Sequence, residues 1–152
     1  RDNTIGLLDF GALRIHDTGR SQSFTELLRA AMEQDLEKTV NAACAVGYIN
    51  KDDPFNYRMA IADLIQTAAE PALHEGDYNF GNSSLSQRLS DKLLTLRSQK
   101  DFQRIPPADV IFLHRKLAGI YLLCANINAH VDVQTKIHDI FDLPPEPVSA
   151  VI

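Results

Sequence analysis

Apolar residues recur at helical spacing along most of the chain, and side chains that return every three or four residues give a helix one apolar face. The pattern predicts a mainly α chain. The predicted helices are one opened by Ser23, one between Asp35 and Gly47, one that follows Pro54 and ends before Pro71, one opened by Ser83 or Ser84, one from about Ala108 to Asn128, and a short one from about Val133 to Phe141.

Residues at the predicted helix ends agree with these boundaries. Ser23 and Glu26 have the spacing of a capping box, and Asp35 is a favourable N-cap. Gly47 can end a helix in the left-handed conformation, and Pro107 suits a first helical turn. The sequence between helices predicts a loop over residues 11–20, a turn over 50–54 and a loop over 73–82.

Two predicted helices differ in how their apolar residues are distributed. The helix opened by Ser83 or Ser84 carries one stripe, made of Leu85, Leu89, Leu93 and Leu96. The helix from Ala108 is apolar around most of its circumference, which is typical of a helix at the centre of a domain. Its apolar residues are Val110, Ile111, Leu113, Leu117, Ile120, Tyr121, Cys124 and Ile127.

Composition narrows the classes of function. The 152 residues suit one compact domain, and a net charge of -5 argues against a binder of nucleic-acid phosphates, which would need a basic surface. Cys44 and Cys124 have no metal-ligand or redox-motif spacing and indicate reduced thiols in an intracellular protein. No apolar run reaches membrane-spanning length. The chain begins at Arg1, so we expect it to be a piece of a larger protein.

The sharpest candidate for chemistry is Asp9-Phe10-Gly11, at the end of the short apolar run Thr4–Leu8 that predicts a strand. A carboxylate is a hard oxygen ligand suited to Mg²⁺, and a strand end would fix it while leaving its oxygens exposed. Gly11 permits a sharp turn, and Phe10 can anchor that turn. We therefore expect Asp9 to be a metal ligand, with Phe10 and Gly11 completing the cofactor-binding turn. Asp17 could approach the same place, although a loop charge is the simpler interpretation.

Two further tracts contain polar residues that could carry chemistry. The tract Leu113–Gly119 offers His114 as a base or Arg115 as a phosphate clamp, but no second catalytic residue lies near them in sequence. Polar residues of a packed helix are the preferred interpretation. The tract Asn79-Phe80-Gly81 has no carboxylate and receives no metal role. The five histidines have no metal-ligand spacing.

Taken together, several tracts resemble the UbiB/AarF family of atypical kinases, most closely its ubiquinone-pathway branch. The resembling tracts are Gly6–Arg14, Phe24–Ala31, Tyr78–Gly81, and Ile105-Pro106-Pro107 followed by Leu113–Gly119. The resemblance runs from about residue 5 to 141. The Asp-Phe-Gly turn is shared by kinases generally, whereas the Pro-Pro and Leu-His-Arg-Lys-Leu-Ala-Gly tracts are more specific to the family.

The resemblance implies the helical C-lobe of a protein-kinase-like fold, with one short strand or hairpin carrying Asp-Phe-Gly. It implies use of ATP and Mg²⁺ by the full-length protein, support of ubiquinone biosynthesis, and peripheral membrane association. Residues 1–143 would form the C-lobe part and residues 144–152 a Pro-rich tail. The expected partners are the missing N-lobe of the same protein, quinone-biosynthesis proteins and a lipid surface. The bacterial cytoplasmic face and the mitochondrial matrix both remain open as locations.

The family's ATP-gripping lysine, its catalytic-loop aspartate and the asparagine for a second metal have no counterpart here. We therefore expect this chain alone to be inactive, with no catalytic residue of its own. A non-enzymatic helical interaction module is the main alternative. An aminoglycoside-type phosphotransferase is a further one, which the tract Leu113–Gly119 argues against.

Overall fold

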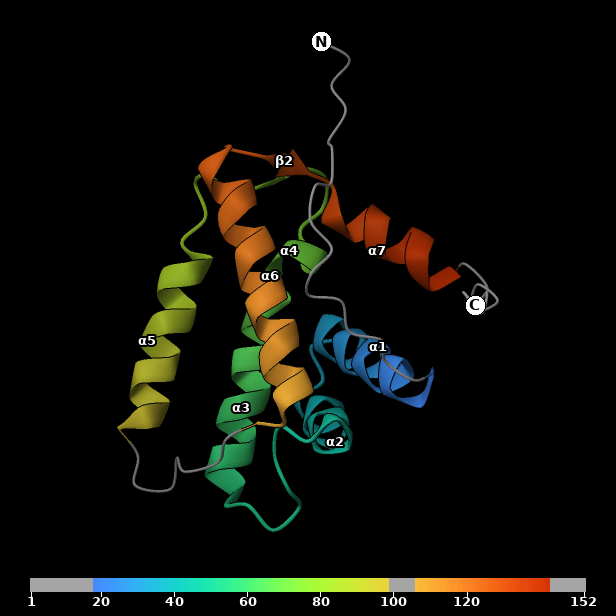
Figure 1. Ribbon diagram of the computed structural model, residues 1–152, viewed down its shortest axis with the longest axis vertical. Helices are drawn as coiled ribbons and strands as arrows, with labels where there is room; N and C mark the ends of the chain where they lie inside the picture. Colours follow the sequence, from blue (N-terminus) through green and yellow to red (C-terminus); the bar gives the residue numbers. More distant parts are fainter. Residues whose placement is uncertain (1–17, 99–105, 143–152) are drawn as a thin grey trace, which may run out of the picture.

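The computed structural model describes residues 18–98 and 106–142, which are mainly helical (Figure 1). The mainly α fold class is thereby confirmed. The elements in chain order are α1 (Thr18–Met32), α2 (Leu36–Val46), α3 (Phe55–Ala68), α4 (Glu70–Leu73), β1 (Tyr78–Asn79), α5 (Leu85–Arg97), α6 (Ala108–Asn126), β2 (His130–Val131) and α7 (Val133–Asp142).

The core lies among α1, α2 and α3, where the apolar faces of three consecutive helices meet. Two further helices each add one residue to this core, Leu96 from α5 and Val110 from α6. The buried core residues are Leu27, Val40, Ala43, Val46, Ile49, Tyr57, Ile61, Ala62, Leu96 and Val110. Burial of this apolar surface is the main source of stability for the helical group.

The ends of α2 are set by the residues that the sequence indicated. The Asp35 side chain accepts a hydrogen bond from the Lys38 amide at 3.0 Å, which satisfies one of the free N–H groups of the first turn. Gly47 ends the helix with φ at 91°, and its amide donates to the carbonyl oxygens of Ala43 and Cys44. Both predicted caps of this helix are confirmed.

The predicted start of α1 is wrong. The helix begins at Thr18, so residues 18–20 are helical where a loop was expected, and Ser23 lies inside the helix. The Ser23 hydroxyl donates to the Gly19 carbonyl at 3.0 Å, the bond that a serine makes within a helix. Glu26 accepts from the Gln22 amide at 3.2 Å, so no capping box forms. Residues 11–17 lie outside the described part of the chain.

The predicted loop 73–82 contains a strand. β1 pairs antiparallel with β2, with Tyr78 opposite Val131 and Asn79 opposite His130. The Phe80 amide extends this pairing by donating to the Ala129 carbonyl at 3.1 Å. The pairing joins the segment before α5 to the segment after α6, at the upper end of the molecule in Figure 1.

The expected stripe of α5 is buried only at its ends. The helix begins after Ser84, as predicted, and Leu85 and Leu96 are buried. Leu93 is exposed and Leu89 is half-buried, because α5 packs mainly on the neighbouring α3 and is open along the rest of its length.

The expectation that α6 is central is wrong for the residues that the structure describes. Its bounds agree with the prediction to within two residues, but Val110 is its only buried residue. Large apolar side chains remain exposed along it, among them Leu117, Ile120, Leu122 and Leu123. In Figure 1, α6 lies across the front of the molecule, between α5 and the α1–α2 pair.

Candidate functional site

The residues predicted to bind metal and nucleotide lie outside the described part of the chain. Asp9, Phe10 and Gly11 all fall in residues 1–17, as do the predicted strand Thr4–Leu8 and Asp17. Their roles therefore stay predictions. The structure does describe three of the other tracts that carry the family resemblance, Phe24–Ala31 in α1, Tyr78–Gly81 and Leu113–Gly119.

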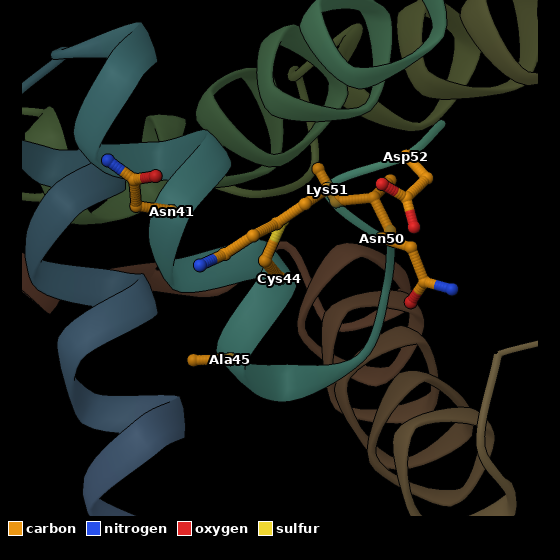
Figure 2. A pocket seen from close by; sticks show the side chains of 7 residues that line it. Asn41, Cys44, Ala45, Asn50, Lys51 and Asp52 are labelled. Atoms are coloured by element: carbon orange, nitrogen blue, oxygen red, sulfur yellow. The ribbon is translucent and has the colours of Figure 1, made fainter. Parts of the chain in front are cut away.

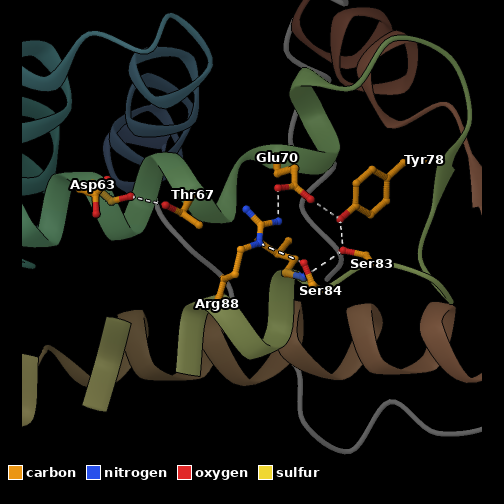
Figure 3. A network of polar contacts seen from close by, with 8 residues as sticks. Asp63, Thr67, Glu70, Tyr78, Ser83, Ser84 and Arg88 are labelled. Atoms are coloured by element: carbon orange, nitrogen blue, oxygen red, sulfur yellow. Dashed lines mark hydrogen bonds and ion pairs between the residues drawn. The ribbon is translucent and has the colours of Figure 1, made fainter. Parts of the chain in front are cut away.

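A polar network surrounds the hydroxyl of Tyr78, which is itself a buried residue (Figure 3). This hydroxyl donates to the Glu70 carboxylate at 2.7 Å and shares a hydrogen bond with the Ser83 hydroxyl. The other Glu70 oxygen forms an ion pair with Arg88. The network thereby ties the short helix α4, strand β1 and the first turns of α5 to one another.

The network shifts the acidity of its members. Burial alone would raise the pKa of Glu70, but hydrogen bonds from Arg88 and Tyr78 and the charge of Arg88 outweigh it, so this pKa is lowered. Burial raises the pKa of the Tyr78 hydroxyl well above its usual value. Glu70 is therefore ionised and Tyr78 protonated at neutral pH, which fits a fixed structural contact rather than a proton-transfer pair.

Aromatic side chains extend this network to α6. Phe80 stands edge-on to Tyr78, with ring centres 4.9 Å apart, and to Tyr121 at 5.5 Å. Asn79 closes the turn that follows, because its side-chain oxygen accepts from the Asn82 amide. At Gly81 a Cβ atom would collide with the Asn128 side chain and lie 3.2 Å from the Asn128 Cα atom, so a larger residue would force one of these two segments to shift. The tract Tyr78–Gly81 therefore anchors α4 and α5 to the C-terminal end of α6.

The tract Leu113–Gly119 lies on α6, and it meets the C-terminal end of α2. The His114 Nε2 atom and the Tyr48 hydroxyl share a hydrogen bond, and their ring centres are 5.1 Å apart. One turn earlier on α6, Asp109 forms an ion pair with Arg20 of α1 at 2.5 Å. These contacts hold the N-terminal half of α6 against α1 and α2.

Burial governs the acidity of the Tyr48–His114 pair. Burial raises the pKa of Tyr48 to about 12, although the nearby charge of Arg20 lowers it in part. Part of the His114 surface is open to solvent, but burial on its Tyr48 side lowers its pKa. At neutral pH the tyrosine keeps its proton and can donate it to the neutral imidazole. The hydrogen bond with Tyr48 agrees with the preferred interpretation of His114 as a polar residue of a packed helix.

An open pocket of about 540 Å³ lies beside the C-terminal half of α2 (Figure 2). Lys51 reaches back along the helix toward Asn41, and the Cys44 thiol points into the same space. None of the residues that carry the family resemblance lines the pocket.

Neither a metal site nor a membrane span is found over residues 18–98 and 106–142. No group of three or more His, Cys, Asp or Glu side chains there could hold a metal ion. No helix in these ranges is long and apolar enough to cross a membrane.

Comparison with known proteins gives the chain its relatives. It is 33% identical over 132 residues to the mitochondrial atypical kinase COQ8 of Schizosaccharomyces pombe, covering 84% of this chain and 21% of that protein. It is 27% identical over 137 residues to the mitochondrial atypical kinase COQ8B of Rattus norvegicus, covering 90% of this chain and 26% of the relative. It is 28% identical over 143 residues to the mitochondrial atypical kinase COQ8 of Saccharomyces cerevisiae, covering 93% of this chain and 28% of that protein.

No protein-family model matches the chain. The chain spans about a quarter of the length of the curated relatives it matches. The helical fold and these relatives together define the class as the C-lobe of an atypical, protein-kinase-like protein. The chain belongs to the UbiB/AarF family, which the COQ8 kinases represent here, and the expected resemblance is confirmed.

Several residues with defined contacts were missed from the sequence. Tyr48 and Arg20 gave no signal because their partners lie 66 and 89 positions away along the chain. Glu70 gave none because its contacts with Tyr78 and Arg88 depend on how α4, β1 and α5 fold together. Tyr78 lies in a tract that the resemblance singled out, and its position beside Phe80 was the available signal.

Proposed function

We propose that this chain is part of the C-lobe of a UbiB-type atypical kinase or ATPase that uses Mg²⁺ and ATP and supports ubiquinone biosynthesis. The observation that carries the proposal is the match to proteins named atypical kinases over 84–93% of the chain. A chain that matches about a quarter of each relative would depend on the remainder for turnover, so the isolated chain is expected to be inactive.

In this proposal Asp9 is the metal ligand, and Phe10 and Gly11 complete its turn. A bound Mg²⁺ would bridge the phosphates of ATP and neutralise their charge. Among the described residues, no group of three or more His, Cys, Asp or Glu side chains could hold a metal ion, so Asp9 stays the proposed ligand. The other ligands and the catalytic groups would come from the rest of the polypeptide.

The described helices would act as the scaffold of that site. The core of α1–α3 supplies a rigid body, and the network around Tyr78 fixes the segments that flank α5 and α6. Rigid elements hold a catalytic carboxylate more precisely than loops do. The role of the resembling tracts Tyr78–Gly81 and Leu113–Gly119 is then structural support rather than chemistry.

The proposed location is inside the cell, at a membrane surface and in contact with quinone-biosynthesis proteins. The names of the relatives place those proteins in mitochondria, which supports the matrix side for a eukaryotic source. A bacterial source would correspond to the cytoplasmic face.

The test is Mg²⁺-dependent ATP hydrolysis by the full-length parent protein. Asp9→Asn should reduce the rate by roughly a hundredfold or more, because an amide holds Mg²⁺ far less strongly than a carboxylate. Asp139→Asn, at an exposed position of α7, is the matched control and should leave the rate unchanged. Calorimetry should also find weaker binding of Mg²⁺-ATP in the Asp9→Asn protein.

An Asp9→Asn protein with unchanged hydrolysis and binding would reject Asp9 as the ligand. If the parent neither hydrolyses nor binds ATP, the chain belongs to a non-enzymatic helical interaction module.

A further inference from the structure

One face of α6 carries an unbroken apolar row with the spacing of a helix–helix interface. Its members follow one another at alternating intervals of four and three residues. We call this row the α6 seam, and it consists of Leu113, Leu117, Ile120, Cys124 and Ile127. This alternation of intervals is the a/d pattern by which one helix packs along another at a small crossing angle.

The seam is open at three of its five positions, whereas Leu113 and Cys124 are half-buried. Leu117 is 56% exposed, Ile120 50% and Ile127 66%, values usual for polar surface residues. A different face of α6, next to the seam, makes the contacts with the rest of the structure. There His114 contacts Tyr48 and Tyr121 contacts Phe80. Within the described residues, α6 is therefore fixed in place while its seam has no helix against it.

The opposite side of α6 differs in composition. Leu122 is 55% exposed there, but at about 100° per residue it shares its side of the helix with Arg115 and Asn126. One leucine between polar residues is ordinary surface, whereas a continuous row of large apolar residues marks an interaction surface. Leu123, which is 60% exposed, lies on the flank of the seam next to Lys116. The continuous apolar row of α6 is thus the seam together with this flank.

We propose that the α6 seam is covered by a helix from the remainder of the same polypeptide, outside these 152 residues. The inference rests on the proposed function, because it takes this chain as one part of a longer kinase. Two observations favour this occupant. About three quarters of each curated relative lies outside the matched segment, so the relatives carry ample chain to supply a helix. The intervals of the seam fit a helix, and Lys116 beside it would face an acidic residue of that helix.

The experiment compares thiol labelling at two neighbouring positions of α6. In a Cys44→Ser, Cys124→Ser background, Ile120→Cys places a thiol in the seam and Leu122→Cys places one on the opposite side. The two side chains start from nearly equal exposure, 50% and 55%. Each variant is prepared both as the 152-residue chain and as the full-length parent, and its rate of reaction with a maleimide is measured.

Both thiols should react at similar rates in the 152-residue chain. In the parent, the Ile120→Cys thiol should react roughly tenfold or more slowly, because labelling then needs local opening, while Leu122→Cys keeps its rate. Equal rates at both positions in the parent would overturn the proposal. So would slow labelling of Ile120→Cys in the short chain, since the seam would then already be covered within it.

The same labelling measurement also distinguishes other partners that could cover the α6 seam. Protection of Ile120→Cys in the short chain that grows with its own concentration would assign the seam to a second copy. Protection that appears only with vesicles of phosphatidylcholine and phosphatidylglycerol would assign it to a lipid surface. Either result contradicts the proposal. A parent that protects the seam but hydrolyses no ATP would reject the proposed activity and keep this interface.

Discussion

At the scale of single residues, the pair formed by Tyr48 and His114 shows how a tract that suggested catalysis serves as a structural contact. The imidazole of His114 shares a hydrogen bond with the hydroxyl of Tyr48, a residue 66 positions earlier in the sequence. Spacing along the chain could not have indicated this pair, because only the fold brings α2 and α6 together.

The lowered pKa of His114 makes the stability of the chain depend on pH. Above about pH 6.5, the pKa of an unfolded histidine, the residue is neutral in both states and its contribution is fully present. As pH falls below that value, the unfolded state takes up a proton more readily and stability is lost. We expect His114→Gln to flatten the decline in unfolding free energy between about pH 7.5 and 5.5, measured by urea unfolding.

His138→Gln is the matched control, because His138 is exposed on α7. It should retain the pH dependence of the unsubstituted chain. If the unfolding free energy declines equally with falling pH in the His114→Gln and unsubstituted chains, the imidazole titrates alike in the folded and unfolded states.

At the scale of elements, local signals determined which boundaries could be predicted. Asp35 and Gly47 cap α2 through bonds to residues within one turn, so the sequence contained all the information needed. Ser23 has the same chemistry as a cap, but α1 continues in front of it and its hydroxyl bonds within the helix. The β1–β2 pair was missed because each strand has two residues and its partner lies about fifty positions away.

Phe80 is the side chain through which β1 contacts α6, and its shape matters there. Phe80→Leu removes both edge-on aromatic contacts, and it should lower the unfolding free energy by about 1–2 kcal/mol. The measurement is urea unfolding of the 152-residue chain. Phe55→Leu is the control, because Phe55 is 70% exposed and should tolerate the change. Equal effects of the two substitutions would mean that Phe80 does not stabilise the attachment of α6.

At the scale of the whole molecule, the fold class followed from periodicity, but the position of each helix did not. The sequence showed that α6 is apolar on most sides, and a central location was the simplest interpretation. The structure leaves it at the surface, since periodicity shows how apolar a face is and not what covers it. The candidate site followed only from the Asp9-Phe10-Gly11 motif and the family resemblance, because its other expected members have no counterpart in this sequence.

The manner in which α6 is attached has a consequence for the order of folding. The core of α1–α3 joins neighbours in sequence, whereas Tyr48–His114 and Arg20–Asp109 close loops of 66 and 89 residues. Closing long loops costs chain entropy, so α6 should dock late and detach first. Native-state hydrogen exchange of the 152-residue chain should give a lower free energy of opening for the amides of α6 than for those of α2. Equal protection of both helices would mean that α6 and the α1–α3 core open as one cooperative unit.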